Sequence, residues 1–144
     1  MPASTPTAAD LPAPSSQHGD LTRQVPGEPP RAPHLLAGAR AEQAAAAFLE
    51  DQGLTVLAHN VRTRRGEIDL IALDQGTLVF CEVRWRRDGR FGGALGSVDG
   101  RKQMRMRRAA QEWLSANADR CPARLDLLCA EGPPPWSWLW LRGV

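Results

Sequence analysis

The sequence is poor in the residues that bind soft metals or form disulfides. It contains three cysteines, three scattered histidines and a single lysine, Lys102. The cysteines form no Cys-x-x-Cys pair, and Cys81 lies inside an apolar run that is typical of a strand. These features argue against a zinc site and a disulfide framework, and they favour a reducing compartment.

Long apolar segments are also missing. No apolar run in the sequence approaches the roughly 20 residues that a membrane-spanning helix needs. The first residues lack the basic head and apolar core of a secretory signal. We therefore expect a cytoplasmic protein that has no membrane partner.

Residues 1–33 are rich in Pro, Ala, Ser and Thr and contain almost no large apolar side chains. Such a segment cannot bury enough apolar surface to offset the entropy lost on ordering, which predicts a disordered tail. The tail is either a functional arm or the product of a start site assigned too far upstream. Residues 34–144 are expected to form one domain, because a chain of 144 residues is short for two good cores.

Two segments have apolar residues at helical spacing. The first is predicted to form a helix over Leu35–Gln52, with Gly53 at its C-cap position. The second is predicted to form a helix over about Gly100–Asn117, with Ser97 or Asp99 as its N-cap. A glycine-rich loop precedes this second helix.

Five segments have the alternation or the apolar content of β-strands. The second and third should form a hairpin around Asp74-Gln75-Gly76, after a polar, basic connection at His59–Gly66. Three tryptophans alternate in the last strand, and we favour core packing over a base-stacking platform for them. The order helix, three strands, helix, two strands predicts an α/β fold, with two helices flanking one mixed sheet of about five strands. The predicted strands are 54–57, 67–73, 77–86, 123–130 and 136–143.

Two acidic residues lie within the apolar hairpin. If Leu73 lies opposite Leu78, then Asp69 falls directly opposite Glu82, whereas a shift of one residue makes it face Cys81. In the first register the two carboxylates repel each other unless a cation lies between them or one is protonated. Mg²⁺ or Mn²⁺, which prefer oxygen ligands, would be the natural cation.

Two further residues would complete such a site. Glu42, in the first predicted helix, offers a third oxygen ligand. Arg84 lies two residues beyond Glu82 and points to the same side of the strand, where its guanidinium could clamp a phosphate. Carboxylates that hold a divalent ion beside such a cation suggest a metal-assisted phosphodiester hydrolase.

Each of these residues also has a structural alternative. Asp69 and Glu82 could form ion pairs with nearby arginines, which would leave the protein with an interaction role instead. Glu42 and Lys102 could be solvated residues on helix surfaces. Glu67, which follows the basic connection, is expected to be a salt-bridge partner rather than a ligand.

Positive charge is unevenly distributed along the chain. The net charge is only +2, yet twelve of the eighteen basic residues lie between positions 62 and 108, together with six acids. Such a cluster is typical of a surface that binds a phosphate-bearing partner. A coding bias toward arginine could explain the number of arginines but explains their clustering less well. We assign nucleic-acid contacts to Arg62, Arg64, Arg65, Arg86, Arg87, Arg101 and Arg105.

Several blocks of the sequence resemble, in order and spacing, those of the YraN family of bacterial proteins. The blocks cover about residues 35–128 and read "GARAEQAAAAFLEDQGLTVLAHNVR", "GEIDLIA", "LVFCEVRWRR" and "FGGALGSVDGRKQ". That family is predicted to adopt the restriction-endonuclease-like fold, near the archaeal Holliday-junction resolvases. The resemblance therefore implies DNA as the partner, with branched or damaged DNA as candidate substrates. Resolvases of this fold act as two-fold dimers, so a homodimer is also allowed.

The resemblance also implies a set of site residues. Glu42 matches the helix carboxylate of related nucleases, and a polar residue of the second helix, Lys102 or Gln103, would complete the site. The nuclease motif of Asp, then Glu-x-Lys, is matched by Asp69, Glu82 and Arg84.

One position departs from the nuclease motif, because Arg84 stands where the motif has lysine. Arginine stays protonated in proteins, so it can stabilise negative charge but cannot act as a base. The sequence therefore predicts a metal-dependent endonuclease or, as the alternative, a nucleic-acid-binding module whose nuclease site no longer turns over.

Overall fold

The computed structural model describes residues 33–88, 93–96, 99–117 and 120–144. The predicted tail lies outside these residues, apart from Pro33, and so does the candidate cap Ser97. In chain order the elements are α1 (Pro33–Asp51), β1 (Thr55–Thr63), β2 (Gly66–Asp74), β3 (Thr77–Arg86), α2 (Gly93–Gly96), α3 (Gly100–Asn117), β4 (Ala123–Glu131) and β5 (Leu139–Arg142).

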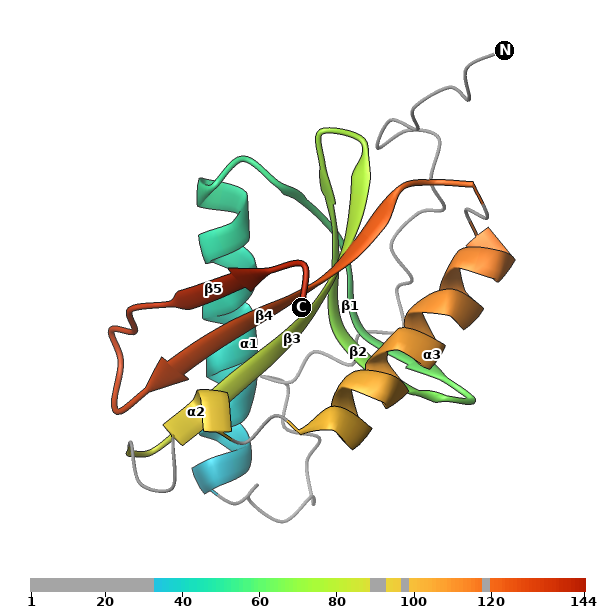
Figure 1. Cartoon of the computed structure of the whole chain (residues 1–144). Helices are drawn as coiled ribbons and strands as arrows, with labels where there is room; N and C mark the ends of the chain where they lie inside the picture. Colours follow the sequence, from blue (N-terminus) through green and yellow to red (C-terminus); the bar gives the residue numbers. More distant parts are fainter. Residues whose placement is uncertain (1–32, 89–92, 97–98, 118–119) are drawn as a thin grey trace, which may run out of the picture.

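The strands form one mixed sheet in the order β1-β2-β3-β4-β5. Strands β3 and β4 are parallel, and the other neighbours are antiparallel. The long helices α1 and α3 lie on opposite sides of the sheet (Figure 1). This confirms the predicted element order and the restriction-endonuclease-like arrangement, to which α2 adds one turn within the segment predicted as a glycine-rich loop.

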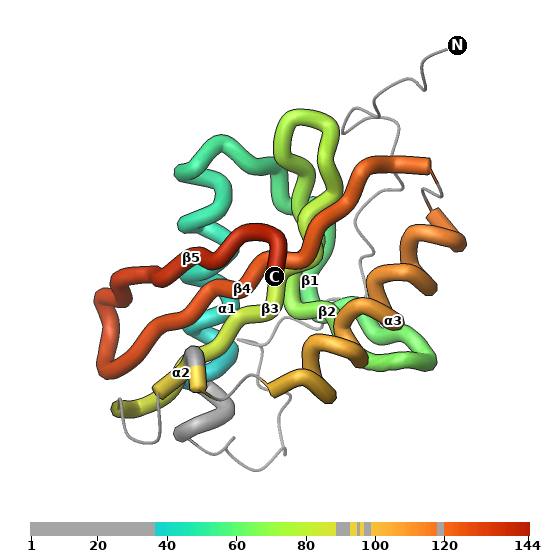
Figure 2. Tube along the Cα trace, viewed as in Figure 1, coloured from blue at the N-terminus to red at the C-terminus, as the bar shows by residue number. Residues whose placement is uncertain are grey.

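The central strands are apolar on both faces of the sheet. Phe80 packs with Ala109 of α3 on one face, whereas Leu70 and Val79 pack with Leu49 of α1 on the other. All five residues are almost completely buried. Burial of a large apolar side chain contributes roughly 1.5–3 kcal/mol, so β3 is held firmly between its neighbours. Figure 2 shows the trace of β3 running between β2 and β4.

The first strand is longer than predicted. The sequence suggested a strand at 54–57 followed by a basic connection, but β1 continues to Thr63 and the chain turns at Arg64-Arg65. The prediction was wrong because β1 is an edge strand, and the polar residues in its second half are exposed or half-buried. Their polarity therefore resembles that of a loop.

The last strand is shorter than predicted and is restricted to Leu139–Arg142. Trp138 and Trp140 lie against Phe48 of α1, with ring centroids 6.5 and 5.9 Å apart. Both tryptophans are half-buried and pack against the core on the α1 face of the sheet. Core packing, which the sequence analysis favoured, is confirmed for these two rings.

Candidate functional site

The hairpin of β2 and β3 places the two predicted acids opposite each other. Its tight turn contains Gln75 and Gly76 with φ values of 47° and 85°, which a two-residue hairpin turn of the mirror-image type requires. Leu73 lies opposite Leu78, as in the first of the two registers considered above. Continued along both strands, this register brings Asp69 opposite Glu82.

The side chain of Asp69 is fixed where the β2–β3 ladder ends. Backbone pairing of the two strands stops at Leu70 and Cys81. Beyond this point, Asp69 Oδ2 accepts a hydrogen bond of 2.9 Å from the Val83 amide. The carboxyl group therefore takes the place of a backbone acceptor, and its position follows that of the sheet.

Asp69 and Glu82 are joined by a side-chain hydrogen bond. Burial and then the charge of Glu82 raise the pKa of Asp69 from 3.8 to about 8, although the hydrogen bond from the Val83 amide opposes this rise. Burial also raises the pKa of Glu82, against the lowering effects of Arg84 and of the hydrogen bond with Asp69. Two carboxyl groups can share a hydrogen bond only when one holds a proton, so Asp69 is the protonated donor at neutral pH.

Two cations contact the same oxygen of Glu82. Arg84 Nη2 lies 2.8 Å from Glu82 Oε1, and Lys102 Nζ lies 3.4 Å from it. Lys102 lies in the first turn of α3, where Asp99 Oδ1 caps the helix by accepting a 2.8 Å hydrogen bond from the Lys102 amide. The structure therefore brings four predicted catalytic residues together, which are Asp69, Glu82, Arg84 and Lys102.

Arg84 keeps unused hydrogen-bond donors in this site. Its side chain is only 12% exposed, and its Nε and Nη2 atoms are buried without a hydrogen-bond partner. The contact between Nη2 and Glu82 is short enough for an ion pair but lacks the alignment of a hydrogen bond. A buried donor without an acceptor costs about 1–3 kcal/mol, so an oxygen-rich anion that met these donors would be favoured.

Glu42 lies near the acidic pair but is not part of it. Burial raises the pKa of Glu42, a hydrogen bond with Asn60 lowers it, and the charges of Glu82 and Glu67 raise it further. Across the described ranges, no three His, Cys, Asp or Glu side chains gather closely enough to hold one ion. The predicted ligand set therefore divides into the pair Asp69 and Glu82, and a neighbouring Glu42.

The sequence analysis assigned Glu67 correctly but did not identify Asn60. Glu67 pairs with Arg62 at 3.3 Å, which is the salt-bridge role expected for it. Asn60, the partner of Glu42, was not singled out, although its φ of 47° is a conformation that asparagine tolerates better than most residues. Its position in a polar segment gave no other signal.

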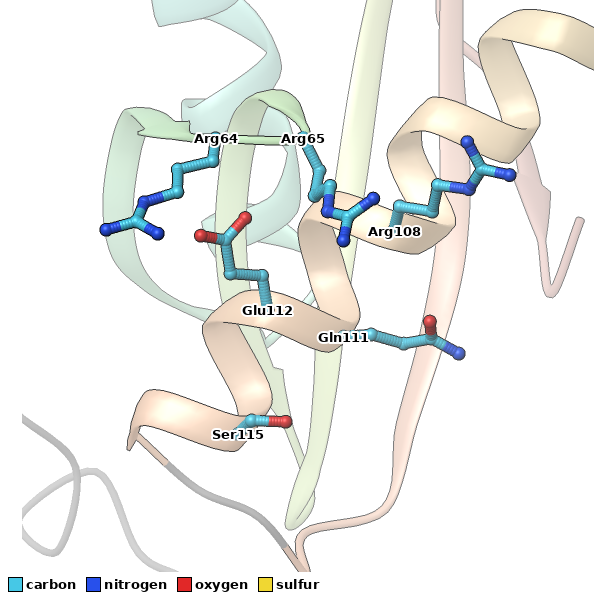
Figure 3. Close-up of a pocket in the computed structure, with 6 residues that line it drawn as sticks. All are labelled: Arg64, Arg65, Arg108, Gln111, Glu112 and Ser115. Carbon is cyan, nitrogen blue, oxygen red and sulfur yellow. The ribbon is translucent and has the colours of Figure 1, made fainter.

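Four of the predicted nucleic-acid contacts lie together along α3 and the β1–β2 turn. A cleft of about 520 Å³ is lined by Arg64, Arg65, Arg108, Gln111, Glu112 and Ser115 (Figure 3). An adjoining cleft is lined by Gly100, Arg101, Met104, Arg105 and Arg108. Arg108 and Glu112, which belong to this surface, were missed by the sequence analysis.

The other three predicted contacts lie elsewhere. Arg62 is exposed but tied to Glu67. Arg86 is exposed at the end of β3 and donates to the Trp85 carbonyl, and Arg87 follows it at the surface. No helix in the described part of the chain is both long and apolar enough to cross a membrane.

Comparison with known sequences identifies the family. The model of the uncharacterised protein family UPF0102 matches residues 41–129. The chain belongs to this family. The match confirms the YraN resemblance and contains every residue of the acidic site, from Glu42 to Lys102.

The UPF0102 relatives match most of the domain. A UPF0102 protein of Halorhodospira halophila is 52% identical over 95 residues, which cover 66% of this chain and 77% of the relative. One of Alcanivorax borkumensis is 50% identical over 96 residues, covering 65% and 77%. One of Pseudomonas putida is 44% identical over 116 residues, covering 76% and 94%. The domain is therefore shared over nearly the full length of the Pseudomonas relative.

Proposed function

We propose that this UPF0102 protein is a metal-dependent phosphodiesterase that acts on DNA. One observation carries the proposal: Asp69 and Glu82 face each other in a largely buried site, and Arg84 and Lys102 contact Glu82 from two elements. A divalent ion would relieve the repulsion between the two acids, and a phosphate would accept hydrogen bonds from the neighbouring cationic side chains.

The acidic pair fits a hard divalent cation. Both residues offer only oxygen ligands, and the raised pKa of Asp69 means that a cation would replace a proton there. Mg²⁺ is usually held by one or two protein carboxylates together with water and substrate phosphate, so a third protein ligand is not required. When bound, Mg²⁺ or Mn²⁺ would supply Lewis acidity and a water of lowered pKa.

The protein residues would then have distinct roles. Asp69 and Glu82 would hold the ion, while the Val83 amide keeps Asp69 oriented. Arg84 would direct its unpaired Nε donor to an oxygen of the scissile phosphate and, with the rest of its guanidinium group, stabilise charge that develops there. Lys102, the only lysine in the sequence, would balance the charge of Glu82.

A nicking assay tests this function directly. Wild type with Mn²⁺ should slowly cleave labelled junction, flap or linear duplex DNA, and the Asp69→Asn protein prepared in the same way should not. Equal cleavage by the two proteins would indicate a contaminating nuclease. Absence of cleavage by wild type on every substrate, with Mn²⁺ and DNA both shown to bind, would overturn the enzymatic proposal.

A non-catalytic nucleic-acid-binding role is the second candidate. Two observations favour it: the described residues gather no three-acid ligand set, and Arg84 replaces the motif lysine. The Arg84→Lys variant separates the two candidates, because a lysine beside a metal can lower its pKa as arginine cannot. Cleavage by Arg84→Lys alone would indicate a nuclease that lost its activating residue, whereas inactivity of both proteins would leave the binding module.

A further inference from the structure

Arginine side chains along α3 and the β1–β2 turn are left without protein partners. Some other arginines of the described chain have partners: Arg62 pairs with Glu67, Arg124 with Asp126, and Arg107 donates to the Val144 carbonyl. Within the part of the chain that the structure describes, no hydrogen bond or ion pair is formed by the guanidinium groups of Arg64, Arg65, Arg101, Arg105 and Arg108.

These five arginines line two adjoining clefts, which we together call the groove. The two clefts described above share Arg108, and the α3 residues that line them follow the helical spacing of one face. At a rise of 1.5 Å per residue, the face from Arg101 to Ser115 is about 21 Å long. One DNA strand advances about 3.4 Å per phosphate, so this length corresponds to roughly six phosphates.

A carboxylate lies in the same groove but does not neutralise it. Glu112 Oε2 is buried and has no hydrogen-bond partner. In Figure 3 the Glu112 carboxylate lies between the side chains of Arg64 and Arg65, and neither forms an ion pair with it. The guanidinium donors of Arg64 and Arg65 are therefore not used by the Glu112 carboxylate and stay available to a ligand. This arrangement is what an external polyanion would need.

We infer that this groove binds the phosphate backbone of duplex DNA, and that the negative charge of Glu112 weakens this binding. The inference rests on the proposed function, because it supplies the docking surface for the same substrate. The groove begins at Arg101, next to Lys102, which contacts Glu82. A duplex lying along α3 therefore reaches the acidic site at the N-terminal end of the helix, while the rest of it follows the arginines.

Fluorescence anisotropy with a labelled duplex of about 20 base pairs, in EDTA and over a salt series, tests the groove without any cleavage. The Arg105→Ala/Arg108→Ala and Arg64→Ala/Arg65→Ala variants should bind more weakly than wild type, and their log–log salt slopes should each be smaller by about 2. The Glu112→Gln variant should bind more tightly than wild type with an unchanged slope, because it removes a repulsive charge but no phosphate contact.

The matched control is Arg40→Ala/Arg142→Ala, which removes two exposed positive charges from α1 and β5. It should keep the wild-type slope. Equal loss in this control and in the groove variants would show that only net charge matters and would overturn the inference, as would wild-type binding by both groove variants. If a groove variant fails to fold, a Glu112→Gln protein that binds no more tightly than wild type still contradicts the account.

The groove and the acidic site can fail separately. Retained cleavage with no groove effect on binding would reject the groove and leave the proposed phosphodiesterase intact. Normal groove-dependent binding with no cleavage would support the groove and reject the enzyme.

Discussion

The sheet contains two buried acidic centres, which differ in how far the protein itself supplies their hydrogen-bond partners. Asp126 in β4 is fully buried, and Arg124 Nε donates to both of its oxygens at 3.0 and 3.2 Å. Trp140 Nε1 and the Gly143 amide donate to it as well, each at 3.0 Å. Arg124 in turn reaches Asp74 at 2.9 Å. Every strong acceptor of Asp126 is therefore met by the protein itself.

The Asp69–Glu82 centre in the neighbouring strands is left incomplete. Burial and the charge of Glu82 raise the pKa of Asp69, the two carboxyl groups hydrogen-bond each other, and buried donor atoms of Arg84 lack a hydrogen-bond acceptor. A network that satisfies itself stabilises the fold, whereas a network with acid facing acid costs stability and retains capacity for a ligand. The comparison thus separates a structural acid from a functional one within the same sheet.

The largest expected effect on stability is the loss of the Asp126 network. Replacing Asp126→Ala leaves Arg124 and the Trp140 indole without their shared acceptor, and the free energy of unfolding should fall by about 3–5 kcal/mol. Asp69→Asn should change it by less than about 1 kcal/mol, because the amide still accepts from Val83 and donates to Glu82. Urea denaturation measures both values. Similar losses in the two variants would remove the distinction.

The next largest effect concerns the rate of DNA cleavage. Arg84→Ala removes the free donors that the phosphate would meet, and the rate should fall by roughly 10²–10³, as is typical when one electrostatic donor is lost. Arg40→Ala, which removes an exposed arginine of α1, serves as the control and should cleave as wild type does. Initial rates with Mn²⁺ measure the effect, and wild-type activity in Arg84→Ala would exclude a role for this side chain in the reaction.

A smaller effect on stability is expected from the hydrogen bond that joins Trp140 in β5 to Asp126 in β4. Trp140→Phe keeps an aromatic ring against Phe48 but removes the indole donor to Asp126, which should cost about 1 kcal/mol of unfolding free energy. Trp136→Phe is the matched control, since its indole donates only to the Gly132 carbonyl in a loop. Thermal or urea unfolding compares the two, and a larger loss in Trp136→Phe would contradict the assignment.

A further effect is a pH dependence of stability. The pKa of Asp69 rises from 3.8 to about 8 on folding, so between these values the folded protein holds a proton that the unfolded chain has released. Stability should therefore fall as pH rises through this window, and the raised pKa values of Glu82 and Glu42 act in the same direction. Melting temperatures from pH 5 to 9 should show a smaller fall in Asp69→Asn. The same fall in both proteins would assign the dependence to other groups.

Much of the fold could be predicted because local sequence and tertiary packing agree there. The bounds of β3 and α3 follow from an apolar run and a clear helical face, and both were predicted correctly. The register of the hairpin follows from its Asp-Gln-Gly turn. The second half of β1 could not be recognised, because an edge strand with exposed polar residues has no apolar alternation to mark it.

The site was only partly predictable from sequence. Alternation along two paired strands left two registers open for Asp69, and the structure has the one that places it opposite Glu82. The distance from Glu42 on α1 depends on how the helix packs. Asp126 was missed because a single acid in "ARLDLLCA" gives no pattern, and its partner Trp140 lies in another strand. Arg124, two residues before Asp126 on the same face, was the one local signal.

The most direct test of the central claim is a calorimetric titration with Mn²⁺ at pH 7 in buffers of different ionisation enthalpy. Because Asp69 is protonated at this pH, ion binding at the Asp69–Glu82 pair should release about one proton per ion. The Asp69→Asn/Glu82→Gln protein should not bind the ion there. Mn²⁺ binding that is as strong in this double variant as in wild type, or wild type that binds no ion, would contradict the account.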